Sequence, residues 1–448
     1  MARRRRNVAS AKTGVSMTRS VLLVTSNGWG LGHLIRQLTI SKYFPDDVRC
    51  TILTLSQAAH VAAQENLEYA PSYSQPWVTK AQWHGGYLRD RIVALAEEVQ
   101  ADTIVYDGVV PYIGLLDAMR RLNATRVWMR RGLWRTDADK RPLKASRWFD
   151  LVIEPADIGS SHDVGPTSQL KDATHVGVIT DARASAGLSR AEAAARLGCD
   201  PSRKTLLINI GSSAIGDLSE LNDVLAAHPD WQIVTTKDSL GRSRHVGDEV
   251  ISVAGVFPLY PYLSAVDLAV TSAGYNAAHE FIGMGVPSIY VPAPTTTDDQ
   301  FARAEAIAAT GAGWAVIDQD PHALAHVLDL VLADDEHRAA VRQSALATRE
   351  SWVDGAAPAA AAILAAPPKQ VRETALDRAS LALRVEAELL VGNVLRRQHN
   401  HSHRDFILTR ELSPALMASD VPLEHMLPCA SEEYSGRRAR LAKEWFTS

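Results

Sequence analysis

The sequence predicts an α/β protein in which two doubly wound parallel sheets face each other across a cleft, followed by a helical C-terminal extension. The chain has 448 residues, too many for one ordinary hydrophobic core. Short apolar runs alternate with helical segments, as in βαβ units whose parallel sheet is covered on both faces. This alternation stops at 181–204 and then begins again, which indicates two units of the same kind.

The N-terminal unit is expected over 19–182, after a disordered basic tail at 1–18 that contains Arg3–Arg6. Its first strand is the apolar run 21–25, which leads through a glycine-rich turn into a helix. Further strands are expected at 48–55, 103–106, 125–129 and 151–154, with helices at about 33–44, 57–66, 86–100 and 111–122.

The C-terminal unit is expected over 183–366, and it begins with a short helix capped by Ser189. Its strands are expected at 205–210, 231–236, 250–254, 267–271 and 287–291, with helices at about 217–228, 275–284, 298–310 and through 320–365. The double proline Pro367-Pro368 then interrupts the chain. The remainder, 367–448, is expected to be a mostly helical extension, because 370–396 carries apolar residues at helical spacing.

Composition excludes several classes of protein. The net charge of −4 gives no reason to expect nucleic-acid binding. Cys50, Cys199 and Cys429 lie far apart, which argues against a disulfide framework or a cysteine zinc site and fits a reducing cytoplasm. No apolar run approaches the roughly 20 residues that span a bilayer. We therefore expect a cytoplasmic protein, whose basic start offers at most weak, peripheral contact with anionic membranes.

A glycine-rich loop, Ser26 to Arg36, follows the first expected strand and opens a helix. Ligands of doubly wound folds lie at this end of the strands, where glycines allow close approach and the helix offers free N–H groups. The loop is not a P-loop, because no Gly-Lys-Ser/Thr follows. His33 falls in the first helical turn, where a neutral imidazole can serve as a base. A tight turn without a ligand is the alternative.

These residues carry a resemblance to a known family. The pattern Gly-x-Gly-x-Gly-His-x-x-Arg over 28–36 resembles the opening of MurG-like glycosyltransferases (family 28). Segments 257–280, 283–292 and 298–304 resemble the donor site of that family and of the UDP-glycosyltransferase superfamily (family 1). The resemblance, over about 20–365, implies a GT-B fold with an N-terminal acceptor-side and a C-terminal nucleotide-sugar-binding Rossmann-like domain. It also implies that the last helices cross back onto the N-terminal domain, a role for 375–396.

The resemblance implies a set of donor-binding residues. Backbone N–H groups after Ala273-Gly274 would hold a diphosphate at a helix N-terminus, Glu280 would accept ribose hydroxyls, and Asp299 with Gln300 would contact the donor sugar. The full set is Gly32, Gly211, Ser212, Ser213, Phe257, Ala273, Gly274, Tyr275, Asn276, Glu280, Asp299 and Gln300. The alternatives are an exposed acid at Glu280, a core role for Phe257 and helix capping by the acids before Gln300, with Asp298 the better cap.

A catalytic pair is suggested by Asp107, which ends a strand of the N-terminal sheet and so lies on the same edge as His33. In plant-type and antibiotic-type relatives a similar Asp orients the loop His, which deprotonates the acceptor hydroxyl. The alternative for Asp107 is a turn residue. Arg36, one helical turn after His33, and Trp29 are candidates for contact with phosphate or acceptor, and a local salt bridge is the alternative for Arg36.

Some features depart from the family or stay ambiguous. Trp29 and Leu31 interrupt a loop that is often richer in glycine, and His279 stands where relatives commonly carry an apolar residue. The segment Trp128 to Trp134, with Arg130 and Arg131, is either an acceptor-side patch or a partly buried aromatic pair with solvated arginines. The alternate histidines at 399–403 lack acidic or cysteine partners and favour a polar surface segment.

The expected function is that of an inverting glycosyltransferase. It would move a sugar from a nucleotide-diphosphate donor, with a UDP-sugar favoured, to a hydroxyl acceptor, with no metal and no cofactor beyond the nucleotide sugar as co-substrate. Two alternatives remain: a nucleotide-sugar hydrolase or epimerase on the same fold, which also fits Arg36, and a non-catalytic protein that binds nucleotides or carbohydrates.

Overall fold

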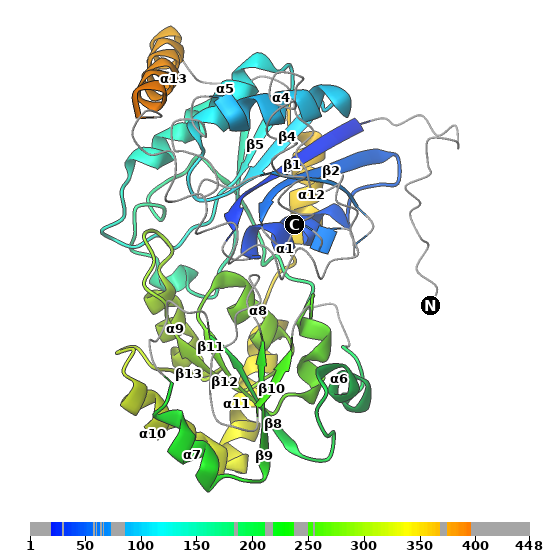
Figure 1. Ribbon diagram of the computed structural model, residues 1–448, viewed down its shortest axis with the longest axis vertical. Coiled ribbons are helices and arrows are strands. Elements are labelled where there is room, and N and C mark those ends of the chain that lie inside the picture. The colour runs from blue at the N-terminus through cyan, green and yellow to red at the C-terminus, as the bar shows by residue number, and fades with distance from the viewer. Residues whose placement is uncertain are drawn as a thin grey trace.

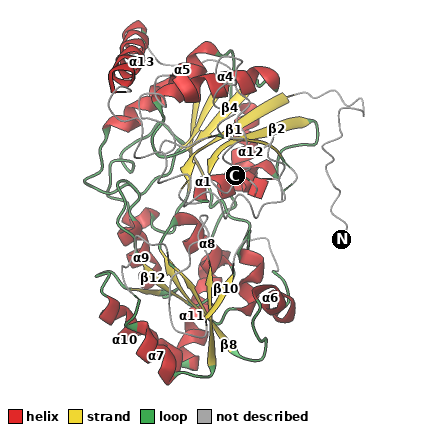
Figure 2. Cartoon of the chain, in the orientation of Figure 1, coloured by secondary structure: helices red, strands yellow, loops and turns green. Residues whose placement is uncertain are grey.

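The computed structural model describes 19–28, 31–56, 59, 61–62, 65, 67–72, 86–182, 187–210, 218–236, 250–253, 256–367 and 374–395. Two α/β units lie one above the other, each a sheet with helices on both faces (Figures 1 and 2). The expected basic tail, most of the helix expected at 57–66, and the site candidates Trp29, Gly211, Ser212 and Ser213 lie outside the described residues.

The N-terminal sheet has seven strands in the order β3-β2-β1-β4-β5-β6-β7, and every pairing is parallel. The strands are β1 (Arg19–Gly28), β2 (Val48–Ser56), β3 (Glu68–Pro71), β4 (Thr103–Asp107), β5 (Thr125–Met129), β6 (Leu151–Pro155) and β7 (Thr174–Val176). The doubly wound prediction is confirmed, and the two edge strands β3 and β7 are additions to it.

Side chains of β1 alternate between the two faces of this sheet, because successive residues of a strand point to opposite sides. Leu22 and Val24 pack with helices α4 (Leu88–Glu98) and α5 (Ile113–Arg121). Val21 and Leu23 pack on the other face with α1 (Gly32–Ser41). Both faces are therefore buried, as the continuous apolar run of this strand predicts. The 3-10 helices η4 (Arg141–Trp148) and η5 (Ser160–His162) lie in the connections that precede and follow β6.

The C-terminal sheet has six parallel strands in the order β10-β9-β8-β11-β12-β13. They are β8 (Lys204–Asn209), β9 (Trp231–Thr236), β10 (Val250–Val253), β11 (Leu268–Ser272), β12 (Ser288–Val291) and β13 (Trp314–Ala315). The helices are α6 (Arg190–Leu197), α7 (Leu221–Ala227), η6 (Tyr260–Ala265), α8 (Tyr275–Gly283), α9 (Gln300–Ala309), α10 (Pro321–Ala333) and α11 (Asp335–Glu350). Ser189 caps α6 as predicted, in a capping box with Glu192.

The chain passes between the two units twice, and the two passages are hydrogen-bonded to each other. The N–H of Val178 donates to the carbonyl of Val353 at 2.9 Å, and the N–H of Gly355 donates to the carbonyl of Val178 at 3.0 Å. A Cβ on Gly355 would lie 1.9 Å from the carbonyl oxygen of Gly177. Two glycines thus let two backbones meet where the units join.

The last two described helices both lie on the N-terminal unit (Figure 1). Helix α12 (Ala356–Ala365) buries Ala359 and Ile363 in the core beside α1. Helix α13 (Ala375–Leu395) buries Leu381 and Val385 in the core on the other face of the sheet, and it contacts α5. The expected boundary at 366 grouped α12 with the C-terminal unit, whereas its small alanines pack closely on the N-terminal sheet. Among the described residues no helix is long and apolar enough to cross a membrane.

Candidate active site

The ends of two adjacent strands bring His33 and Asp107 together. Strand β1 pairs with β4, with Thr25 opposite Asp107, and His33 lies in the first turn of α1, which follows β1. The Nδ1 atom of His33 is 2.7 Å from Oδ1 of Asp107. The carboxylate is fully buried, whereas the imidazole keeps 19% of its surface exposed. The pair expected from the sequence therefore forms, with the histidine on the solvent side.

Two further residues of α1 hold the Asp107 carboxylate. Nε of Arg36 donates to Oδ2 at 2.8 Å, its Nη2 donates to Oδ1, and Nε2 of Gln37 donates to Oδ2 at 3.0 Å. Arg36 thus makes the local salt bridge that was one of its two sequence interpretations. Gln37 was missed, although its spacing of four residues from His33 places it on the same helix face.

The charges of this cluster settle its protonation. Burial acts to raise the pKa of Asp107, but the Arg36 charge and the hydrogen bond from His33 outweigh it, so the pKa falls to about 2. Burial lowers the pKa of His33, Asp107 opposes this, and the Arg36 charge adds to the lowering. Because the ionised Asp107 only accepts, Nδ1 of His33 carries the proton and Nε2 keeps the lone pair that a general base uses.

The N-terminus of α8 lies against this cluster from the other unit. Asn276 donates from Nδ2 to the carbonyl oxygen of Gly32 at 3.1 Å. The guanidinium of Arg36 lies 5.5 Å from the centre of the Tyr275 ring. The hydroxyl of Tyr275 donates to the carbonyl of Ala156 at 3.0 Å. The expected donor residues Ala273, Gly274, Tyr275 and Asn276 therefore stand opposite the catalytic candidates, at the start of a helix.

His279, the departure from the family pattern, is a buried neutral contact between the units. Its Nδ1 donates to the carbonyl of Tyr275 at 2.6 Å, and its Nε2 accepts from the N–H of Ile158 at 3.3 Å. Burial lowers its pKa to about 4. An apolar residue would leave the Ile158 N–H without this acceptor, which gives a physical reason for a histidine here.

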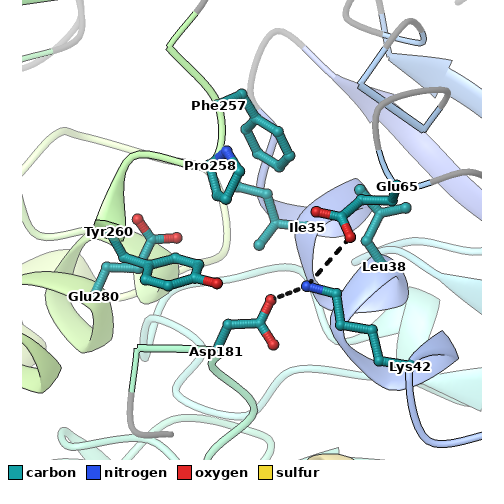
Figure 3. Close-up of a pocket in the computed structure, with 9 residues that line it drawn as sticks. All are labelled: Ile35, Leu38, Lys42, Glu65, Asp181, Phe257, Pro258, Tyr260 and Glu280. Carbon is teal, nitrogen blue, oxygen red and sulfur yellow. Dashed lines mark hydrogen bonds and ion pairs between the residues drawn. The ribbon is translucent and has the colours of Figure 1, made fainter. Parts of the chain in front are cut away.

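A pocket opens between α1 and the C-terminal unit (Figure 3). Ile35 and Leu38 of α1 line it, together with Lys42, the residue that follows this helix. The C-terminal unit contributes Phe257, Pro258, Tyr260 and Glu280, and Glu65 and Asp181 complete the lining. Lys42 forms an ion pair with Asp181 and lies 3.6 Å from Glu65. Phe257 is only partly buried and packs against the N-terminal core. Phe257 therefore belongs to the C-terminal unit, lines the pocket and also packs on the N-terminal unit.

Glu280 is the unusual group of this pocket. Its side chain is 8% exposed, and no hydrogen bond reaches its carboxyl group from the part of the chain that the structure describes. Burial, with a smaller contribution from the Asp181 charge, raises its pKa to about 8. A buried carboxyl group without donors is costly. The interpretation of Glu280 as an exposed helix acid is therefore wrong.

The acids before α9 differ from the sequence expectation. Asp299 caps the helix by accepting from the Ala302 N–H at 3.0 Å, so the preference for Asp298 as the cap was wrong. Asp298 is buried instead and pairs with Arg131 at 3.1 Å and Arg303 at 2.8 Å. Both arginines lower its pKa against the effect of burial. Gln300 accepts from the Ala293 N–H at 2.9 Å through Oε1, which leaves its Nε2 as a donor near Gly274.

A segment of the N-terminal unit lies beside these acids. The N–H of Arg135 donates to the Thr297 carbonyl at 2.7 Å, and the N–H of Asp299 donates to the Leu133 carbonyl at 2.8 Å. Arg303 also reaches across to Asp157 at 2.7 Å. Backbone pairing and buried ion pairs thus hold the two units together at α9.

The aromatic segment before these contacts is buried. Trp128 and Trp134 lie in the core, and Arg130 is buried with Glu154 and Asp172 as its partners. The arginines at 130 and 131 are paired rather than solvated, and Arg130 is not available to an acceptor. Groups of three or more His, Cys, Asp or Glu suited to a metal ion do not occur among the described residues.

Comparisons with known proteins agree with this arrangement. Residues 236–354 match the family model of the Glycosyltransferase family 28 C-terminal domain. The UDP-N-acetylglucosamine--N-acetylmuramyl-(pentapeptide) pyrophosphoryl-undecaprenol N-acetylglucosamine transferase of Clavibacter michiganensis is 32% identical over 175 residues, which are 38% of this chain and 47% of that protein. The match thus spans about half the length of this relative.

Solved structures resemble the whole two-unit arrangement. The glycosyltransferase SnogD from Streptomyces nogalater aligns with a TM-score of 0.51 at 15% identity, over 78% of this chain and 99% of that one. The glycotransferase of kitacinnamycin aligns with a TM-score of 0.51 at 18% identity, over 78% and 99%. The fold is therefore GT-B, with a C-terminal unit similar to the glycosyltransferase family 28 C-terminal domain.

Proposed function

We propose that this protein is an inverting glycosyltransferase that moves a sugar from a nucleotide-diphosphate donor, a UDP-sugar, to a hydroxyl acceptor. The observation that carries the proposal is the pairing of a partly exposed His33 with the buried Asp107, 2.7 Å apart, beside the N-terminus of α8. The similarity of 236–354 to a glycosyltransferase domain supports the same reaction class. The N-terminal unit would bind the acceptor and the C-terminal unit the donor.

The chemistry follows from this arrangement. Nε2 of His33 takes the proton of the acceptor hydroxyl as its oxygen attacks the anomeric carbon. The bond between that carbon and the diphosphate oxygen breaks, and the electron pair leaves with the diphosphate. N–H groups at the start of α8 stabilise this developing negative charge. Asp107 holds the tautomer of His33 and stabilises the imidazolium that forms.

Donor recognition would use the pocket and the start of α9. A ribose would supply to Glu280 the hydrogen-bond donors that the described residues do not provide. Phe257 would lie against the nucleobase. Nε2 of Gln300 would donate a hydrogen bond to the nucleotide sugar. No step of this proposal uses a metal or a further cofactor, because helix and loop N–H groups hold the diphosphate.

The alternative of a nucleotide-sugar hydrolase drew on the Gly-His-x-x-Arg pattern that contains Arg36. In the structure two nitrogens of Arg36 are engaged with Asp107, and Arg36 is 1% exposed. We therefore give Arg36 no contact with phosphate in this proposal, and an assay of the products separates the two reactions. We further propose a cytoplasmic location, with weak contact between the basic residues Arg3–Arg6 and anionic membranes.

A thermal-shift screen of the purified protein against UDP-, TDP- and GDP-sugars tests donor binding, because a ligand of the native state raises the unfolding temperature. Chromatography of the products with the best donor and a panel of hydroxyl acceptors then separates transferred sugar from free sugar. Transfer supports the proposal. Release of free sugar as fast as any transfer would indicate the hydrolase instead.

A further inference from the structure

We propose that Arg36 is a positioning residue for the base: it fixes the orientation of the Asp107 carboxylate and compensates its charge beside His33. The inference rests on the proposed role of His33. It goes beyond that role, because Arg36 is 1% exposed and its guanidinium contacts Asp107, through which it acts on His33.

Arg36 and Gln37 hold the Asp107 carboxylate through three nitrogen atoms. Arg36 grips Asp107 with two nitrogens, Nε at Oδ2 and Nη2 at Oδ1. Gln37 adds a donor to Oδ2 at 3.0 Å. A forked arginine–carboxylate contact fixes the plane of the carboxylate. Oδ1 is thereby held 2.7 Å from Nδ1 of His33, and the imidazole receives one defined partner.

Three charged side chains act on His33. Asp107 of β4 favours the imidazolium, whereas Arg36 of α1 and Arg131 after β5 oppose it. Nη2 of Arg36 lies 3.2 Å from Nδ1 of His33, whereas Oδ1 of Asp107 lies 2.7 Å from the same atom. A His–Asp pair by itself would raise the pKa of the imidazole. Burial lowers the pKa of His33 below its ordinary value, and the Arg36 charge adds to this effect.

Tyr275 of the C-terminal unit packs against Arg36 and helps to fix its position. The Tyr275 ring covers its guanidinium, and the Tyr275 hydroxyl is fixed by the Ala156 carbonyl and the Ile179 N–H at 3.0 and 3.1 Å. Burial acts to lower the pKa of Arg36, but the charges of Asp107 and Asp298 raise it and favour the cationic form. Helix α8, which starts the expected diphosphate site, contacts α1 (Figure 1), and its first residue, Tyr275, lies against Arg36.

The test is an NMR titration of His33 in protein with isotope-labelled histidine, with His33→Gln to assign the signal. In Arg36→Gln the titration midpoint of His33 is expected to rise by about one pH unit or more, the scale of one lost neighbouring charge. Arg36→Lys keeps the cation and should stay near the wild type. The acid limb of the pH–rate profile should shift in the same direction. An unchanged or lowered midpoint in Arg36→Gln, with a folded protein, overturns the proposal.

A second comparison covers the case in which Arg36→Gln does not fold, since it leaves Asp107 without its cation. The variant Asp107→Asn with Arg36→Gln replaces the ion pair by two amides. Relative to Asp107→Asn alone, it should show a higher His33 midpoint, and equal midpoints would contradict the charge role. The titration needs no turnover. If the His33 midpoint shifts in Arg36→Gln but the wild type transfers no sugar, the proposed function is refuted. The effect of Arg36 on the protonation of His33 would still stand.

Discussion

The buried acid Glu280 should make donor binding depend on pH. Its pKa of about 8 means that about one tenth of the molecules carry an ionised Glu280 at pH 7. If the carboxylate accepts two ribose hydroxyls, binding requires the ionised form and releases a proton. The affinity for UDP should therefore rise with pH, about tenfold per unit below 8 and little above it.

The size of the effect follows from the same shift. Ionising Glu280 one pH unit below its pKa costs about 1.4 kcal/mol, and the ligand must supply this energy. Glu280→Ala should weaken nucleotide-sugar binding by about 1–3 kcal/mol, the scale of a hydrogen bond to a charged group. Glu280→Gln, of equal size but unable to ionise, should bind with an affinity that hardly changes between pH 6.5 and 9.

Isothermal calorimetry with UDP checks this prediction. Titrations at several pH values give the affinity, and titrations in buffers of different ionisation enthalpy count the protons released. Wild type and Glu280→Gln should differ in both quantities. Equal, pH-independent affinities for the two proteins, with no proton release, would remove Glu280 from the nucleotide site.

Four further predictions concern the base, the metal, the C-terminal helices and the junction. His33→Ala should lower kcat by roughly 10²–10⁴-fold with donor affinity little changed, and Asp107→Asn should cost less. The wild-type kcat at saturating donor should fall only at acid pH, because the pKa of His33 is lowered. Near-normal transfer by His33→Ala would place the base elsewhere. Enzyme treated with EDTA should keep its activity, and loss restored by Mg²⁺ or Mn²⁺ would contradict this. A chain ending at 367 should fold and one ending at 354 should not, because α12 buries Ala359, Ala360 and Ile363 in the N-terminal core; circular dichroism decides. Gly355→Ala should destabilise the protein by roughly 1–3 kcal/mol in urea unfolding, whereas Gly86→Ala, which meets only movable side chains of Arg89 and Asp90, should change little.

The central strands were predictable because their middle residues are apolar and buried. Runs 21–25 and 205–210 contain Val21–Val24 and Leu206–Ile208, and strands β1 and β8 include these residues. The edge strands β3, β7 and β13 have four, three and two residues. Such short segments, paired on one side, need no apolar run, and nothing in the local pattern separates them from loops.

The site was predictable only where strand order determines position. Asp107 and His33 each follow a strand, so their meeting follows from the pairing of β1 with β4. The partners of Asp298 could not be foreseen, because Arg131 comes from the other unit. Helix α12 is rich in alanine, and a helix that is apolar all round does not reveal which sheet it covers.

The double passage at Val178 and Val353 also constrains the order of folding during synthesis. The N-terminal core needs Ala359 and Ile363, which leave the ribosome only after the whole C-terminal sheet. The first unit of the chain must therefore wait for the second before its core is complete. For the same reason, a chimera that exchanges the donor-side unit with a relative needs two matched junctions, one near Gly177 and one near Gly355, with both glycines kept.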